Sequence, residues 1–120
     1  MAVNKSAEDY LEAIYFLSKK LPVVRSIDIA HELNFTKPSV SIAMKNLKNL
    51  GMIEVSDAGY ITLTASGKEI ALTISERHEK LTSWLISLGV NEEVAMEDAC
   101  KIEHVISAES FEAIKRHAAK

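Results

Sequence analysis

The stretch Thr36-Lys-Pro-Ser-Val-Ser-Ile-Ala-Met-Lys-Asn-Leu-Lys-Asn-Leu-Gly51 predicts an amphipathic helix. Thr36 is suited to cap it, Pro38 is tolerated in its first turn, and Gly51 is suited to end it. One side is apolar at helical spacing and runs through Val40, Met44 and Leu47 to Gly51. The stripe beside it is polar and basic and consists of Ser41, Lys45 and Lys48. The pattern therefore predicts a helix with one packed side and one side open to solvent.

The segments on either side of this helix favour a winged helix-turn-helix. Ser26 is expected to cap a short helix over residues 27–33, and Asn34-Phe35 is expected to form the turn before Thr36. After Gly51, two β-rich runs at 52–56 and 60–63 are separated by Asp57-Ala58-Gly59, which predicts a hairpin. A generic pair of amphipathic helices has a similar pattern, so the hairpin is what favours the winged helix. This wing, residues 52–63, carries no Lys or Arg, and we expect little phosphate contact from it.

The rest of the chain is predicted to be helical. The first helix is expected to begin at Ser6, with Ser6-Ala-Glu-Asp9 as a capping box. A long helix is expected over residues 64–88, in which Gly67 costs only modest helix propensity. Asn91 and Ser107 are expected to cap two further helices, the first over residues 92–105. The predicted fold is therefore mainly α, with a winged helix over residues 1–71 and a helical domain over residues 72–120.

Composition and charge limit the classes of protein to which this chain can belong. The 120 residues are 48% hydrophobic, carry a net charge of −3 and include one Cys, which cannot form an internal disulfide. No apolar run is long enough to cross a membrane, no signal peptide is apparent, and we expect a cytoplasmic protein. Between residues 13 and 56, six basic residues outnumber three acidic ones, whereas acids dominate after residue 69. The basic half predicts a local nucleic-acid face attached to a different module.

Three candidate metal ligands lie close together near the C-terminus. Cys100, Glu103 and His104 are spaced i, i+3 and i+4, which places them on one face of a helix. A thiolate, a carboxylate and an imidazole suit a first-row transition metal. Taken alone, this stretch favours a small buried Cys beside a solvated Glu-His pair, because one helical turn supplies too few ligands. Taken alone, Asp9 is expected to cap its helix and complement the helix dipole, Glu12 to be solvated, and His78 to be an ordinary surface histidine.

Several motifs together resemble the metal-dependent repressors typified by the diphtheria toxin repressor and the manganese transport regulators. They are Glu8-Asp-Tyr-Leu-Glu-Ala-Ile-Tyr15, Thr36-Lys-Pro-Ser-Val40, Leu63-Thr-Ala-Ser-Gly67, Arg77-His78 and Glu97-Asp-Ala-Cys-Lys-Ile-Glu-His-Val105. The resemblance covers nearly the whole chain. It implies a DNA-binding domain over residues 1–71 and a dimerisation and metal-binding domain over residues 72–120. We expect no SH3-like third domain of the kind found in iron-type relatives.

The resemblance also implies a set of metal ligands, namely Asp9, Glu12, His78, Cys100, Glu103 and His104. Cys100 departs from the manganese pattern, which has glutamate there, and agrees with the iron pattern. Asp9 agrees with the manganese pattern and departs from the iron pattern, which has methionine. The implied site is thus a hybrid for Mn(II) or Fe(II), with Co(II) or Zn(II) as alternatives. Thr82 and Met96 stand where iron-type members place ancillary ligands.

The function implied by the resemblance is a homodimeric, metal-activated transcriptional repressor that controls manganese or iron homeostasis by binding a double-stranded DNA operator. The expected DNA contacts are Arg25, Thr36, Lys37, Pro38, Ser39, Ser41, Lys45 and Lys48. A winged-helix regulator that senses a non-metal signal is the alternative. An enzyme with Cys100 as nucleophile and His104 as base is disfavoured, since no oxyanion donor is evident. A pure interaction module built on Trp84, Leu88 and Ile102 is a third possibility.

Overall fold

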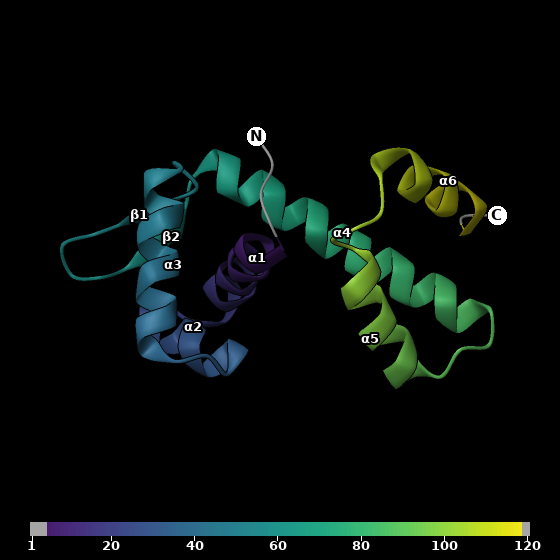
Figure 1. Cartoon of the computed structure of the whole chain (residues 1–120), viewed down its shortest axis with the longest axis horizontal. Helices are drawn as coiled ribbons and strands as arrows, with labels where there is room; N and C mark the ends of the chain where they lie inside the picture. The colour runs from purple at the N-terminus through teal and green to yellow at the C-terminus, as the bar shows by residue number, and fades with distance from the viewer. Residues whose placement is uncertain (1–4, 119–120) are drawn as a thin grey trace. The chain divides into compact units, whose positions relative to one another are not determined.

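The computed structural model describes residues 5–118. Within them the chain forms six helices and one two-stranded sheet, and the predicted mainly α fold is confirmed (Figure 1). The chain consists of two compact units that meet within α4: the first ends at Leu72 and the second begins at Thr73. The order of elements is α1 (Lys5–Lys20), α2 (Ser26–Leu33), α3 (Lys37–Asn49), β1 (Ile53–Val55), β2 (Ile61–Leu63), α4 (Ala65–Ser87), α5 (Glu92–Ile102) and α6 (Ala108–Ala118).

The first unit is a winged helix-turn-helix, as predicted. The apolar stripe of α1, with Leu11 and Ile14 fully buried, packs in one cluster with Ile29 of α2, Val40 of α3 and Ile53 of β1. Fully burying one such side chain contributes about 1.5–3 kcal/mol, so this shared core fixes the three helices and the hairpin as one body. No helix in the described part of the chain is long and apolar enough to cross a membrane.

The ends of α3 are formed as predicted. The Thr36 hydroxyl accepts a hydrogen bond from the Ser39 backbone N–H at 3.3 Å, and Pro38 lies in the first turn, where its missing N–H costs nothing. Gly51 follows the helix with φ +76°, a conformation that glycine adopts without strain. The polar side of α3 is exposed along its whole length, whereas Val40 and Met44 are buried.

The starts of α1 and α2 differ from the prediction by one or two residues. Ser6 lies inside α1, which already includes Lys5, and the Lys5 ammonium pairs with Asp9 at 2.9 Å across this first turn. Ser26 lies inside α2, and Arg25 is the capping residue. The reason is that Asp28 reaches back and accepts the Arg25 backbone N–H at 2.9 Å, so a side chain of the helix itself closes its first turn.

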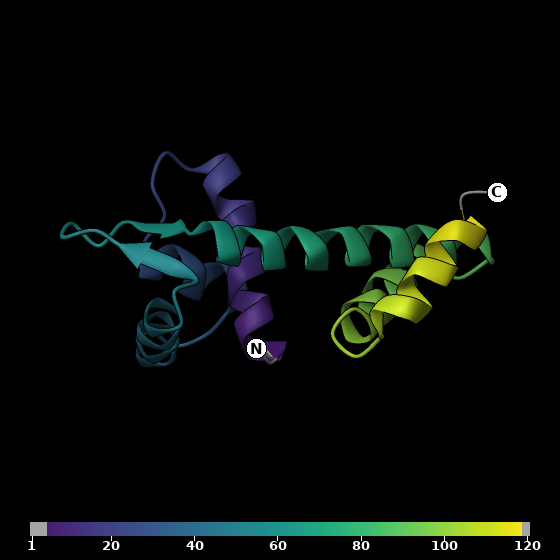
Figure 2. The same ribbon diagram turned by 90° about the horizontal axis from the view of Figure 1, so that it is seen from above.

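The wing is an antiparallel hairpin in which Ile53 pairs with Leu63, and it extends beyond the helices of this unit (Figure 2). The wing carries no basic residue of its own. The structure nevertheless places a cation against Tyr60, at the end of the wing that carries the turn. The Arg25 guanidinium lies 4.9 Å from the centre of the Tyr60 ring, and its Nη2 donates to the Tyr60 hydroxyl at 3.2 Å.

Gly67 has a packing role that its helix propensity does not reveal. The Thr64 hydroxyl caps α4 by accepting the Gly67 backbone N–H at 3.2 Å. At this point the backbone of α4 passes against the backbone of Met52, and a Cβ at position 67 would run into the Met52 carbonyl oxygen. Glycine is therefore required for the close approach of α4 to the hairpin.

The second unit is built from the later part of α4 with α5 and α6. Leu81, Ala99 and Phe111 form its buried core. Asn91 caps α5 and Ser107 caps the start of α6, both as predicted. However, α5 ends at Ile102 and not at residue 105. The helix ends early because the Ile102 carbonyl accepts from Val105 as well as from Ile106, which tightens the chain into a turn over residues 103–106.

Candidate metal centre

One carboxylate of the second unit is buried. Glu103 follows the last residue of α5, and its exposed fraction is 0%. One of its oxygens, Oε2, lies 3.0 Å from Nδ1 of His78 on α4, and the other, Oε1, lies 3.3 Å from Nε2 of His104. Two imidazoles from separate segments thus meet one carboxylate.

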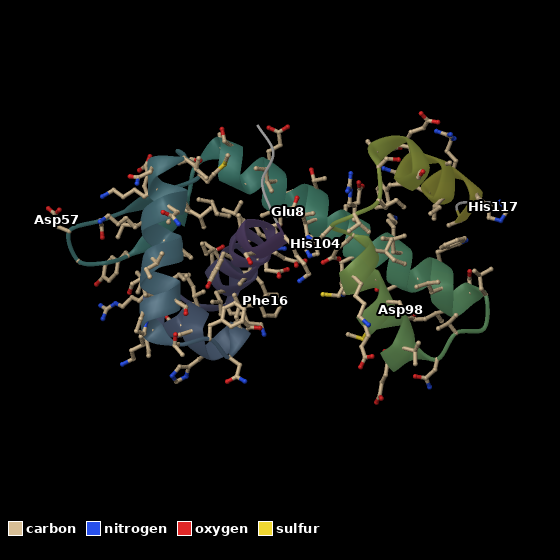
Figure 3. The ribbon with its side chains drawn as sticks, viewed as in Figure 1. Glu8, Phe16, Asp57, Asp98, His104 and His117 are labelled. Atoms are coloured by element: carbon tan, nitrogen blue, oxygen red, sulfur yellow. The ribbon has the colours of Figure 1, made fainter. Side chains whose placement is uncertain are left out.

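Cys100 joins this group at its exposed edge. The donor atoms of Cys100, Glu103 and His104 all lie within 4.8 Å of one another. Figure 3 labels His104 in the turn that follows α5. The expected helical face is only partly correct, because Glu103 and His104 lie beyond the end of α5. The turn at 103–106 still brings the three donors together.

The chemistry of these donors fits a divalent transition metal. A carboxylate that is removed from water is costly unless opposite charge compensates it, and a bound cation provides that compensation. Burial lowers the pKa of His78 below its ordinary value of 6.5, so its ring is held in the neutral form that binds metals. Thiolate, carboxylate and neutral imidazole are together the ligands that first-row metals such as iron, cobalt and zinc accept.

Arg77 holds the turn that carries Glu103 and His104. Its Nη1 donates to the carbonyl oxygens of Glu103, at 3.1 Å, and of Ile106, at 3.0 Å. Its guanidinium also lies 5.6 Å from the centre of the Phe111 ring. Sequence reasoning used Arg77 only as part of a motif and missed this role. Spacing gives no signal for it, since its partners are 26 and 29 residues away.

The remaining predicted ligands lie in the first unit. Asp9 and Glu12 are half-buried residues of α1, three positions apart, and Asp9 also contacts the Lys5 ammonium. The structure brings His78, Cys100, Glu103 and His104 together within the second unit. A place for Asp9 and Glu12 in the same site stays a prediction.

The predicted DNA contacts form an exposed polar surface on the first unit. Seven of them are Thr36, which caps α3, and six residues of α3 itself, and all seven side chains are exposed. Arg25, also exposed, lies apart from them in sequence and contacts the wing through Tyr60. The helix α3 itself contains three lysines and no acidic residue, so every charged side chain on its open side is basic.

Two family models together match almost the whole chain. Residues 2–60 match the model described as iron dependent repressor, N-terminal DNA binding domain. Residues 64–119 match the model described as iron dependent repressor, metal binding and dimerisation domain. The two matches meet near the start of α4.

Individual relatives agree with these models. The chain is 34% identical over 117 residues to the transcriptional regulator MntR of Escherichia coli, covering 94% of this chain and 76% of the relative. It is 36% identical over 115 residues to an uncharacterised helix-turn-helix transcriptional regulator of Methanocaldococcus jannaschii, covering 94% and 92%. The solved structure of the manganese regulator SloR superposes with a TM-score of 0.83 at 26% identity. That match covers 99% of this chain and 55% of SloR, so the chain spans about half the length of the solved relative.

Proposed function

The chain belongs to the iron-dependent repressor family, and from this membership we propose that it is a metal-activated transcriptional repressor that controls manganese or iron homeostasis in the cytoplasm. The named relatives are transcriptional regulators and not enzymes. The observation that carries the metal dependence is Glu103, a fully buried carboxylate contacted by His78 and His104 beside the Cys100 thiol. These four residues, with Asp9 and Glu12 of α1, are the proposed ligands.

The proposed switch depends on charge. Glu103 in the second unit and Asp9 and Glu12 on α1 carry like charges, which oppose their close approach in the absence of a cation. A divalent cation supplies the compensating positive charge when bound. Asp9 and Glu12 would then bind the same cation as Glu103, a contact that would restrain α1. Because α1 and α3 share one core, this contact also restrains α3 and favours the DNA-competent population.

The proposed target is double-stranded DNA, bound by a homodimer. Each copy places α3 in a major groove, with half-sites about 34 Å apart or a multiple of that spacing. Thr36, Lys37, Pro38, Ser39 and Ser41 are proposed to contact base edges and thymine methyls, with Arg25, Lys45 and Lys48 toward phosphates. Selecting duplexes from a random library with the Mn(II)-loaded protein tests this directly. Recovery of a two-fold symmetric sequence is expected, and recovery of no enriched sequence with any of the candidate metals counts against the proposal.

Replacing Lys45 with alanine is expected to weaken DNA binding for all sequences alike. Lys45 lies on the exposed basic stripe of α3, beyond the helix N-terminus, where phosphate contacts are expected. The logarithm of the DNA affinity falls linearly with the logarithm of the salt concentration. Loss of one phosphate contact per copy is expected to make this slope shallower by about one unit per copy. Binding measured across a salt series checks this. Lys80 is an exposed lysine of the second unit, and Lys80→Ala is the matched control. If Lys45→Ala has the same salt slope as this control, Lys45 does not contact a phosphate.

Cys100 is expected to give Co(II) a thiolate-to-metal charge-transfer band that Cys100→Ser lacks. Sulfur is a softer donor than oxygen, so the thiol raises affinity for Fe(II), Co(II) or Zn(II) more than for Mn(II). Asp9 acts in the opposite direction as a hard oxygen donor. Exchanging Cys100 for Glu is therefore expected to move the metal ranking toward Mn(II). Absence of the band in the wild-type protein would leave five ligands and remove Cys100 from the site.

A further inference from the structure

Ile42 has a large apolar side chain that is exposed to solvent. Its exposed fraction is 64%, whereas the other exposed large hydrophobic residues of the first unit, among those the structure describes, lie between 37% and 45%. At 100° per residue, position 42 lies about 200° from both Val40 and Met44, so it faces directly away from the core. The fold of this unit therefore gives Ile42 no packing role.

The surroundings of Ile42 on α3 are polar and basic. Pro38 precedes it by four positions and Lys45 follows by three, so both share its side of the helix, and Ser41 lies on the adjoining stripe. All of them are exposed, and α3 contains no acidic residue. An exposed apolar group among polar and basic side chains fits a partner that is anionic at its edges and carries an apolar group between them.

Duplex DNA has this arrangement. Phosphates line both sides of the major groove, and the thymine C5-methyl is the apolar group that base pairs present within it. An isoleucine side chain has neither a hydrogen-bond donor nor an acceptor, so it contributes to base recognition only by removing such a methyl from water. Lys45 and Lys48, within six positions, are available for the phosphates at the groove edge.

We propose that Ile42 is a specificity-determining residue that recognises a thymine methyl in each half-site of the operator. The proposal rests on the DNA binding put forward above and adds one base preference to it. Ile42 selects thymine over cytosine at its position by the methyl group alone. Ser39 and Ser41, which carry hydroxyls, are left to recognise neighbouring bases by hydrogen bonds.

Deoxyuridine provides an atomic test, because it differs from thymidine only by the missing methyl. Each thymine pair of the selected duplex is replaced by deoxyuridine at symmetric positions, and affinity is measured for the Mn(II)-loaded wild-type protein and for Ile42→Ala. At one symmetric position, loss of the methyl is expected to weaken wild-type binding about fourfold per half-site, as burial of one methyl-sized group predicts. The same replacement is expected to leave the affinity of Ile42→Ala unchanged, so the two changes are coupled.

Two controls separate this effect from folding and from general loss of apolar surface. Val23→Ala shortens an exposed apolar side chain outside α3 and is expected to keep the wild-type response to deoxyuridine. Ile42→Val retains most of the apolar contact and is expected to keep most of the response. Thermal unfolding of Ile42→Ala is expected to match that of the wild-type protein, since the side chain contributes nothing to the core.

The outcomes distinguish the inference from the proposed function. If the wild-type protein binds its selected duplex but no thymine methyl is coupled to Ile42, the inference is overturned and the repressor function stands. If Ile42→Ala binds the selected duplex with wild-type affinity, the inference is likewise overturned, and the exposed isoleucine then has another partner. If the metal-loaded protein selects no DNA at all, both proposals fail together.

Discussion

Replacing Glu103 with glutamine is expected to weaken Mn(II) binding at least about 100-fold, since loss of an outer-shell residue alone costs 10- to 100-fold. Glutamine keeps the size of the side chain but removes its charge and one of the two oxygens that contact His78 and His104. The apo protein is not expected to lose stability to the same extent, because an uncompensated buried charge is itself costly. The stabilisation that metal adds to the wild-type protein is therefore expected to fall by about 2.7 kcal/mol at saturating metal.

Titration of the folded variant with Mn(II) measures the change in metal affinity. The unfolding temperature with and without Mn(II) measures the stabilisation that the metal adds. Glu109→Gln is the matched control, since Glu109 is an exposed glutamate of α6 in the same unit. Equal Mn(II) affinities for Glu103→Gln and the control would remove Glu103 from the site. A variant that binds metal normally but unfolds at lower temperature would assign Glu103 a purely structural role.

Replacing Gly67 with alanine is expected to lower the free energy of unfolding by about 2–3 kcal/mol, the range found for overpacking. Helix propensity alone predicts the opposite sign, a gain of up to about 1 kcal/mol for alanine over glycine. Packing prevails because the new Cβ runs into the Met52 carbonyl, a backbone group that cannot move aside cheaply. That carbonyl also accepts the Thr64 N–H at 3.0 Å, so displacing it breaks the hydrogen bond that joins the hairpin to α4.

Urea unfolding of the metal-free protein measures this change. Ser66→Ala alters the neighbouring, exposed position in the same helical turn and is expected to stay within about 0.5 kcal/mol of the wild-type protein. Stability of Gly67→Ala at or above that of the wild-type protein would contradict the close approach of α4 and Met52.

Features that depend on neighbouring residues were predictable from the sequence. The cap at Thr36, the end of α3 at Gly51 and the hairpin around Asp57-Ala58-Gly59 each follow from side chains a few positions apart, and each is confirmed. The alternation of buried and exposed positions on α3 follows from the same helical spacing. The errors at Ser6 and Ser26 are shifts of one or two residues at helix starts, where several polar residues compete to cap.

Features that depend on distant residues were not predictable from spacing. The pairing of His78 with Glu103 joins residues 25 positions apart, and the bonds from Arg77 to the turn at 103–106 span still more of the chain. The burial of Glu103 arises only when α5 ends at Ile102 and the turn packs against α4. Spacing alone favoured a solvated Glu103 beside a solvated His104. It was the family resemblance, and not the pattern of residues, that predicted His78 as a ligand.

The combination of Asp9 and Cys100 is what separates this chain from both patterns it resembles. Asp9 alone agrees with the manganese type of regulator, and Cys100 alone agrees with the iron type. Together they predict a site whose affinities for a hard and a soft metal differ less than in either type. We therefore expect relative affinity to decide between Mn(II) and Fe(II), and we expect Cys100→Glu to shift that balance toward Mn(II).

The most direct test of metal-activated DNA binding is the affinity for the selected duplex measured by fluorescence anisotropy as free metal rises from a chelated starting point. Mn(II), Fe(II), Co(II) and Zn(II) are titrated separately. For at least one of them, we expect the affinity for DNA to rise roughly 10- to 100-fold as the metal sites fill, the range of a typical coupling between two binding sites. Equal affinity in chelator and in saturating amounts of each metal would contradict the switch.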